Sequence, residues 1–192
     1  MLIQGSVNSF GTAAMSGIAA STSLTGFTYT AMNSFRHATL NFVGQNYGAK
    51  KFDRVRRVVW DSLLCVSVIG IALGLLSAVF AEPLLKLYIT DSAEAIRFGI
   101  TRMWWFGLTY YLAGGMEVLM GALQGLGKST ASMFINVFCT CFIRIVWILT
   151  IFAAAPSLNS LYISYPVSWG LAIIVETVVF SRIVKRKEQE ES

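Results

Sequence analysis

Residues 41–57 read NFVGQNYGAKKFDRVRR, and this stretch joins a long apolar run to a cluster of five cations. The cations are Lys50, Lys51, Arg54, Arg56 and Arg57. Lys and Arg side chains enter hydrocarbon at a high cost, and they accumulate in the short cytoplasmic loops of membrane proteins. The stretch therefore predicts a tight cytoplasmic turn between two membrane-spanning helices. Gly48 is expected to end the first of them in the left-handed conformation.

The composition of the chain is that of a membrane protein. Of its 192 residues, 55% are apolar and only 13% are charged, whereas soluble domains carry about 25% charged residues. The mean hydropathy is +0.63. A soluble fold could not cover so much apolar surface, so we expect a multi-pass protein of the cell membrane, surrounded by lipid.

The formal charge of +5 does not indicate nucleic-acid binding. Ten of the fifteen Lys and Arg residues lie in residues 50–57, at Lys128 and in residues 182–187. These positions separate or follow apolar runs, and no aromatic residues alternate with them as in a nucleic-acid surface. We interpret Lys128, Lys185, Arg186 and Lys187, together with the first cluster, as cytoplasmic anchors of the topology.

The apolar runs predict an all-α membrane protein, a helical bundle with five full transmembrane helices and the end of a sixth. The full helices are expected at about residues 13–47, 58–81, 96–123, 130–155 and 161–183, since about 20 residues suffice to cross a bilayer. Residues 1–10 are expected to end a truncated helix, residues 11–187 to form one transmembrane lobe, and residues 188–192 to be an acidic cytoplasmic tail. Residues 84–91 and 156–160 would then be external loops.

Nothing in the sequence predicts an enzyme. Cys65, Cys139 and Cys141 lie inside apolar runs, which argues against a disulfide or a metal site. The glycine-rich residues 125–129 lack the preceding strand and the spacing of a phosphate-binding loop. We expect no cofactor and no bound metal.

Two segments carry a family resemblance: FVGQNYGAK at residues 42–50 and MEVLMGALQGLGKS at residues 116–129. Together with NSFG (8–11), IRIVW (143–147) and SYPVSW (164–169), in this order, the chain resembles the multidrug and toxic compound extrusion (MATE) family of the bacterial inner membrane. The resemblance implies twelve helices in two six-helix lobes, which exchange Na⁺ or H⁺ for amphipathic, often cationic, compounds. This chain resembles the second lobe, from the end of helix seven to helix twelve. Its partners would be the missing first lobe and a small-molecule substrate.

Polar residues inside the apolar runs are the candidate pathway for a cation, a proton or the substrate, because intramembrane ionisable residues are costly and usually functional. They are Glu117, Arg144, His37, Asn41, Asn136 and Glu176. At 1.5 Å per residue, four of these lie about 9–12 Å from the cytoplasmic ends of their helices. Asn41, Asn136 and Glu176 are therefore the expected partners of Glu117. His37 lies deeper, at roughly 17 Å, and Arg144 at roughly 22 Å, too far for a direct pair with Glu117.

Each candidate has a structural alternative. Glu117 is either a cation-binding or protonatable carboxylate or an acid bonded across helices, and Gly114 and Gly121 are expected to leave space beside it. The resemblance places the carboxylate of one family branch near Ala113, whereas Glu117 fits the Met-Glu pattern of another branch. Arg144 either lines the pathway or ties helices together, and His37 is a candidate proton relay. Glu176 is either a relay residue or a lipid-facing residue whose carboxylate reaches the interface.

Two patterns in residues 13–47 concern packing. Gly17, Ser21 and Thr25 recur at every fourth position, which predicts close approach of another helix. Asn33, His37, Asn41 and Gln45 form a polar stripe that should face protein or water.

The leading hypothesis is one lobe of a secondary antiporter that exports drugs or other amphipathic compounds in exchange for Na⁺ or H⁺. A lipid-linked oligosaccharide flippase of the same superfamily is an alternative and would line its cavity with more cations. A second alternative is an inert truncated fragment, or a helical assembly module, without transport activity. Relatives carry acidic residues of their cation sites on the first and seventh helices, and these two segments are mostly absent from this chain. The lobe alone is therefore not expected to transport.

Overall fold

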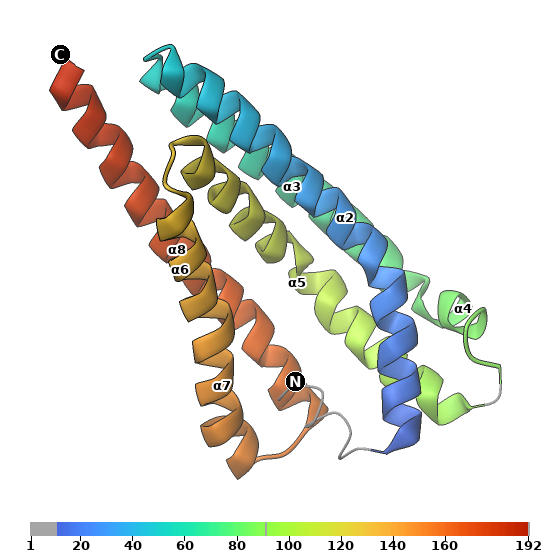
Figure 1. Cartoon of the computed structure of the whole chain (residues 1–192). Coiled ribbons are helices and arrows are strands. Elements are labelled where there is room, and N and C mark those ends of the chain that lie inside the picture. Colours follow the sequence, from blue (N-terminus) through green and yellow to red (C-terminus); the bar gives the residue numbers. More distant parts are fainter. Residues whose placement is uncertain (1–10, 91, 192) are drawn as a thin grey trace.

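The computed structural model describes residues 11–90 and 92–191, and its secondary structure is helical throughout this part of the chain (Figure 1). The long helices are α2 (Thr12–Gly48), α3 (Phe52–Val79), α5 (Ala93–Gly125) and α8 (Leu158–Glu191). A short α4 (Ala81–Lys86) follows α3. One further helix runs from Ser129 to Phe152 and changes its winding on the way, as α6 (Ser129–Asn136), the π-helical η1 (Val137–Phe142), α7 (Ile143–Trp147) and the π-helical η2 (Ile148–Phe152).

Five long helices occupy the regions expected for the five spans, and residues 1–10 lie outside the described residues. Three of them are apolar and long enough to cross a membrane: Phe52–Val79, Ser129–Phe152 and Leu158–Glu190. Helix α8 continues through the predicted acidic tail to Glu191, and the cytoplasmic location of this tail stays a prediction. Glu190 pairs with Arg186 and Lys187, at spacings of four and three residues that favour helix.

The α2–α3 turn differs from its predicted form. Gly48 is still helical, and the left-handed residue is Lys50, with φ of 58°. The N–H of Lys51 donates to the carbonyl of Asn46 at 2.9 Å and closes the helix end. The α5–α6 turn repeats this arrangement with Gly127 at φ of 73° and a bond from Lys128 N–H to the Leu123 carbonyl. A left-handed residue followed by such a bond is a common helix termination.

Close backbone contacts hold α2 and α3 against α5. A Cβ added to Gly17 would lie 2.1 Å from the carbonyl oxygen of Ala95, and one added to Gly74 would lie 2.2 Å from that of Gly107. The predicted close approach at Gly17 is confirmed. The space expected beside Glu117 is filled instead, because Met32 and Val66 side chains pack at Gly114 and the Arg36 backbone packs at Gly121.

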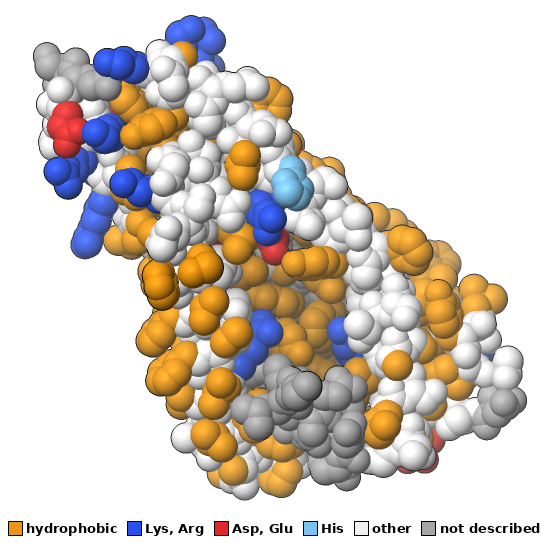
Figure 2. Space-filling view, viewed as in Figure 1, with side chains coloured by type: hydrophobic (Ala, Val, Ile, Leu, Met, Phe, Trp, Pro, Cys, Tyr) orange, Lys and Arg blue, Asp and Glu red, His pale blue; other side chains and the backbone are white. Residues whose placement is uncertain are grey.

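The bundle has two groups of helices on either side of α5. Helices α2 and α3 pack on one side, whereas the helix from α6 to η2 pairs with α8 on the other (Figure 1). Seen from the same side, the molecule has a hollow between α7–α8 and α2, over α5 (Figure 2). We call this the hollow face. Its walls are mostly hydrophobic, and Lys or Arg side chains lie within it.

The predicted cytoplasmic anchors gather at one end of the bundle. The α2–α3 turn, the α5–α6 turn and the end of α8 lie together in Figure 1. Arg56 of α3 forms an ion pair with Glu188 of α8, and Lys128 lines a surface pocket with Arg186 and Lys187. All predicted anchors can therefore lie on the same side of a membrane. That this side is the cytoplasmic one stays a prediction.

Candidate functional site

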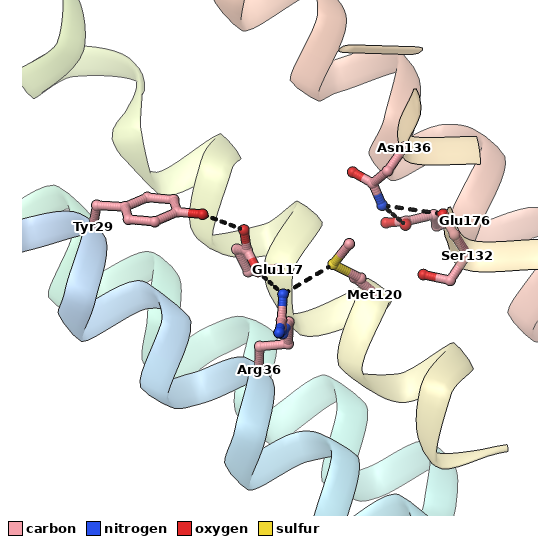
Figure 3. Close-up of polar contacts among 7 residues, drawn as sticks. All are labelled: Tyr29, Arg36, Glu117, Met120, Ser132, Asn136 and Glu176. Atoms are coloured by element: carbon pink, nitrogen blue, oxygen red, sulfur yellow. Dashed lines mark hydrogen bonds and ion pairs between the residues drawn. The ribbon is translucent and has the colours of Figure 1, made fainter. Parts of the chain in front are cut away.

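Glu117 is held between α5 and α2. Its side chain is almost enclosed, with 5% exposed, and Oε1 accepts a hydrogen bond of 3.2 Å from the Tyr29 hydroxyl (Figure 3). Oε2 lies 3.5 Å from Nη1 of Arg36, which also contacts the sulfur of Met120. The backbone approach at Gly121 brings Arg36 within reach of the carboxylate. The charge of Glu117 is therefore compensated within this lobe.

The expected partners of Glu117 are wrong. Asn41 is exposed, and Asn136 donates to Glu176 instead, at 2.8 Å between Nδ2 and Oε1. A depth estimate from helix rise orders residues along the membrane normal, but it leaves the rotation of each helix open. Tyr29 and Arg36 lie on the face of α2 that meets α5, whereas Asn41 lies on another face.

Glu176 and Asn136, predicted to share a layer, lie in direct contact between α8 and α6. Glu176 has no exposed surface, so the alternative of a lipid-facing carboxylate is wrong. Its Oε2 has no hydrogen-bond partner among the described residues, and neither has the enclosed hydroxyl of Ser132. Asn136 Nδ2 also donates to the Ser132 carbonyl at 3.3 Å. These three residues form a polar cluster inside an apolar core (Figure 3).

The polar stripe of α2 is not brought to either carboxylate. His37, Asn41 and Gln45 are exposed on this lobe, and Asn33 is half-buried. No hydrogen bond joins His37 to Glu117 or Glu176 in the described part of the chain. Most of the polar stripe of α2 is therefore accessible on the surface of this lobe.

Arg144 faces α8 rather than Glu117. Its Nε donates to the Ser168 hydroxyl at 3.0 Å, and its guanidinium lies 4.1 Å from the ring centre of Tyr165. It also lies 5.8 Å from the ring centre of Trp169. An arginine over an aromatic face gains cation–π attraction, particularly where water is scarce.

Arg102 is a further functional candidate, which was not among the residues predicted from the sequence. Its Nη1 donates to Ser21 at 3.3 Å and to Thr25 at 3.2 Å, and its guanidinium lies 4.1 Å from the ring centre of Phe106. Ser21 and Thr25 of α2 could have indicated a buried arginine in the neighbouring helix, because such an arginine needs hydrogen-bond acceptors. Tyr29 and Arg36 were not predicted as partners of Glu117 either. They lie on one face of α2, about two helical turns from each other.

An aromatic cluster lies between the two arginines. Phe106 of α5 packs against Tyr165 of α8 at 4.9 Å between ring centres, and Tyr110 stacks on Trp169 at 6.1 Å. Arg102 contacts the α5 side of the cluster, whereas Arg144 contacts its α8 side. Within residues 11–90 and 92–191, neither guanidinium has a carboxylate partner.

The chemistry that these residues offer is binding of protons, ions and aromatic or charged groups. The described residues contain no group of three His, Cys, Asp or Glu side chains placed to hold a metal ion. Among the residues that the structure describes, the buried carboxylates are Glu117 and Glu176. They differ in their neighbours, since Glu117 has a cation and Glu176 has an amide.

Comparisons with known proteins give a consistent result. The family described as MatE matches residues 1–150. The probable multidrug resistance protein YoeA of Bacillus subtilis (strain 168) is 21% identical over 152 residues, which are 77% of this chain and 32% of that protein. The chain thus spans about a third of the length of this curated relative.

Solved structures show a similar fold. A multidrug resistance MATE family transporter of the MOP superfamily, in an outward-facing conformation, matches 98% of this chain with a TM-score of 0.86 and 16% identity. VcmN of Vibrio cholerae in its bent form matches 97% with a TM-score of 0.85 and 19% identity. This chain covers 42% of each of those chains. At such identities the likeness establishes the fold alone.

Proposed function

This chain belongs to the MATE family of membrane transporters, and we propose that it forms one lobe of an antiporter that exports amphipathic compounds in exchange for Na⁺ or H⁺. The single observation that carries the proposal is the hollow face, a mostly hydrophobic concavity with Lys or Arg side chains within it (Figure 2). Family membership and the apolar helices make the chain a membrane protein, and they assign it to transporters rather than enzymes. Its location in a bacterial inner membrane is part of the proposal.

The hollow face suits one wall of a substrate cavity. Transporters built from two pseudo-symmetric halves bind their substrates between the halves, near the middle of the membrane. The aromatic cluster on α5 and α8 offers rings to an amphipathic compound, and such pockets are typically apolar with few polar groups. A coverage of 42% of the related transporters agrees with one lobe whose partner lobe supplies the other wall.

Glu117 is the residue proposed to respond to the exchanged cation. Arg36 has a quarter of its side chain exposed and contacts the carboxylate at 3.5 Å, at the long end of an ion pair. An arriving cation competes with Arg36 for the same oxygen atoms. It thereby favours one arrangement of α2 and α5 over another, as coupling requires. His37, exposed directly after Arg36, is the proposed relay for protons.

Efflux from vesicles tests the proposal. This chain is reconstituted together with a six-helix first lobe from a MATE relative, and export of a fluorescent lipophilic cation is followed under separate Na⁺ and pH gradients. We expect efflux with both lobes present and a dependence on one of the two gradients. Folded, assembled lobes that move no dye under either gradient contradict the proposal and favour an inert fragment or an assembly module.

A flippase for lipid-linked oligosaccharides is the second candidate, and the two arginines favour it. Arg102 and Arg144 carry charges without carboxylate partners in the described residues, and guanidinium groups bind phosphate groups well. The discriminating measurement uses the same vesicles with a fluorescent phosphate-linked glycolipid. Translocation that is lost in Arg144→Gln, with dye export absent, would favour the flippase.

A further inference from the structure

We propose that Glu176 is an enclosed proton-binding site between α6 and α8, in which its carboxyl group is neutral. The site itself is argued from its surroundings in this lobe. Its use in transport rests on the proposed function. It is distinct from the Glu117–Arg36 pair at α2 and α5, which has its own cation.

The carboxyl group of Glu176 is fully enclosed by the lobe. Glu176 has no exposed surface in the lobe by itself, so neither lipid, nor bulk water, nor another polypeptide reaches it without a structural change. Whatever neutralises this carboxylate must already lie inside the lobe. No Lys or Arg of the described residues pairs with it, whereas Glu117 has Arg36. A buried carboxylate without a compensating charge is strongly disfavoured, so the group must hold a cation.

The groups around Glu176 favour a proton over a metal ion as this cation. Asn136 Nδ2 donates to both Glu176 Oε1 and the Ser132 carbonyl, so two acceptors fix the N–H side of the amide toward the carboxyl group. A metal ion at this place would meet hydrogen atoms instead of oxygen ligands. A proton on Oε2 instead supplies a donor to an atom that has no partner. The enclosed Ser132 hydroxyl also has no partner and is not hydrogen-bonded to Oε2 in this structure, but it belongs to the same cluster and becomes the acceptor once the side chains rotate (Figure 3).

The winding of the helix links the site to helix packing. The π-helical η1 begins directly after Asn136 and contacts α8. Such turns are rare and occur frequently at functional sites. Loss of the proton would leave a charge in the contact between α6, η1 and α8, which favours separation of these helices and entry of water.

The other charged and titratable groups define what the site responds to. Glu117 from α5 and Cys139 from η1 interact electrostatically with Glu176. Ser132 and Asn136 from α6 are neutral, and Arg144 from α7 is engaged with Ser168 and Tyr165. Glu117 is therefore the charged group through which the contact of α2 and α5 would act on the enclosed site.

Infrared spectroscopy tests the site without a transport assay. The full 192-residue chain is measured in lipid and D₂O, and the carbonyl stretch of a neutral carboxyl group is followed from acidic to alkaline pH. We expect this band at neutral pH in the wild type and in the control Glu82→Gln, which removes an exposed carboxylate paired with Lys86, and its loss in Glu176→Gln. A band that remains in a folded Glu176→Gln variant, or a folded wild type without one, overturns the proposal.

Two further measurements settle the remaining cases. Replacement of K⁺ by Na⁺ should leave the band unchanged, and its disappearance would assign the site to Na⁺ instead of a proton. If Glu176→Gln does not fold, Ser132→Ala should still shift the band, because it removes the proposed acceptor, and an unshifted band contradicts the geometry. A band with no efflux contradicts the proposed function alone, whereas efflux without a band contradicts this inference alone.

Discussion

Tyr29 and Arg36 are seven residues apart on α2, and this spacing puts both on one face of the helix with Glu117 between them. The two contacts differ in kind. The tyrosine hydroxyl can donate to a neutral or a charged carboxyl group, whereas the guanidinium favours only the charged form. Arg36 is therefore the partner that compensates the charge of Glu117, and an arriving cation would have to replace this contact.

Glu117→Gln should reduce coupled efflux at least about tenfold in a two-lobe preparation, while the protein stays inserted and folded. Glutamine keeps the shape and the acceptor for Tyr29, but it removes the charge by which an ion distinguishes two conformations. Efflux at matched expression, measured across the working pH range, gives the result. Wild-type efflux by this variant would show that another carboxylate couples the ion.

The double variant Arg36→Gln/Glu117→Gln separates coupling from structure. If the ion pair only holds α2 against α5, the neutral pair should restore efflux, since no buried charge is left without a partner. If Glu117 acts on the transported cation, the double variant should be as impaired as the single one. The thermal unfolding midpoints of both variants show whether lost efflux reflects lost stability.

The sequence predicted which residues are chemically unusual more successfully than which residues meet. Asn136 and Glu176 were placed in one layer as partners of Glu117, and in the structure they contact each other instead. Glu117 was placed in the same layer but bonds to α2. Residue depth follows from position along a helix, whereas contact also depends on helix rotation and on backbone approach at glycines such as Gly121. Helix rotation and backbone approach could not be predicted from the spacing of residues in one sequence.

At the scale of elements, α5 owes its central position to small residues. It meets α2 at Ala95 and Gly121 and meets α3 at Gly107, with backbone atoms close to the glycines opposite. Helices in membranes associate through such close packing because lipid provides little hydrophobic driving force. The periodicity of small residues in α2 revealed one of these contacts. The π-helical turns in the helix from Ser129 to Phe152 had no sequence signal.

Gly74→Ala should destabilise the lobe by about 1–3 kcal/mol, because the new methyl group would overlap the carbonyl of Gly107. Gly26→Ala is the matched control: it lies within α2, and an added Cβ there meets nothing within 4 Å. The control should be neutral or more stable by up to about 1 kcal/mol, since alanine is the better helix former. Thermal unfolding in detergent measures both. Equal midpoints for the two variants would mean that α3 and α5 do not cross at this contact.

At the scale of the whole molecule, charge and shape are segregated. The cationic clusters occupy one end of the bundle, whereas the hollow face lies along its side (Figures 1 and 2). The order of apolar runs and cations was enough to predict the helices and their shared cationic end. The hollow was not predictable from periodicity, because it arises from the separation of two helix groups around α5.

The cationic end should be cytoplasmic, because Lys and Arg near membrane spans are retained on that side. Single cysteines are introduced by Lys51→Cys and Ser157→Cys, both at exposed positions, in a background without Cys65, Cys139 and Cys141. In intact cells, an impermeant thiol reagent should label position 157 and leave position 51 unlabelled until the cells are opened. The reverse pattern would invert the topology.

This chain by itself should move no substrate in vesicles, even with its five long helices inserted. It covers 42% of related transporter structures, and in the proposed function its hollow face is one wall of a cavity that needs a second. Binding between two halves, followed by their movement against each other, is what alternates access to the two sides of a membrane. The measurement is dye efflux under Na⁺ and pH gradients, with the two-lobe preparation as the positive control. Gradient-dependent efflux by the chain alone would contradict the one-lobe proposal and would require two copies whose hollow faces meet, which a determination of the stoichiometry in lipid would then reveal.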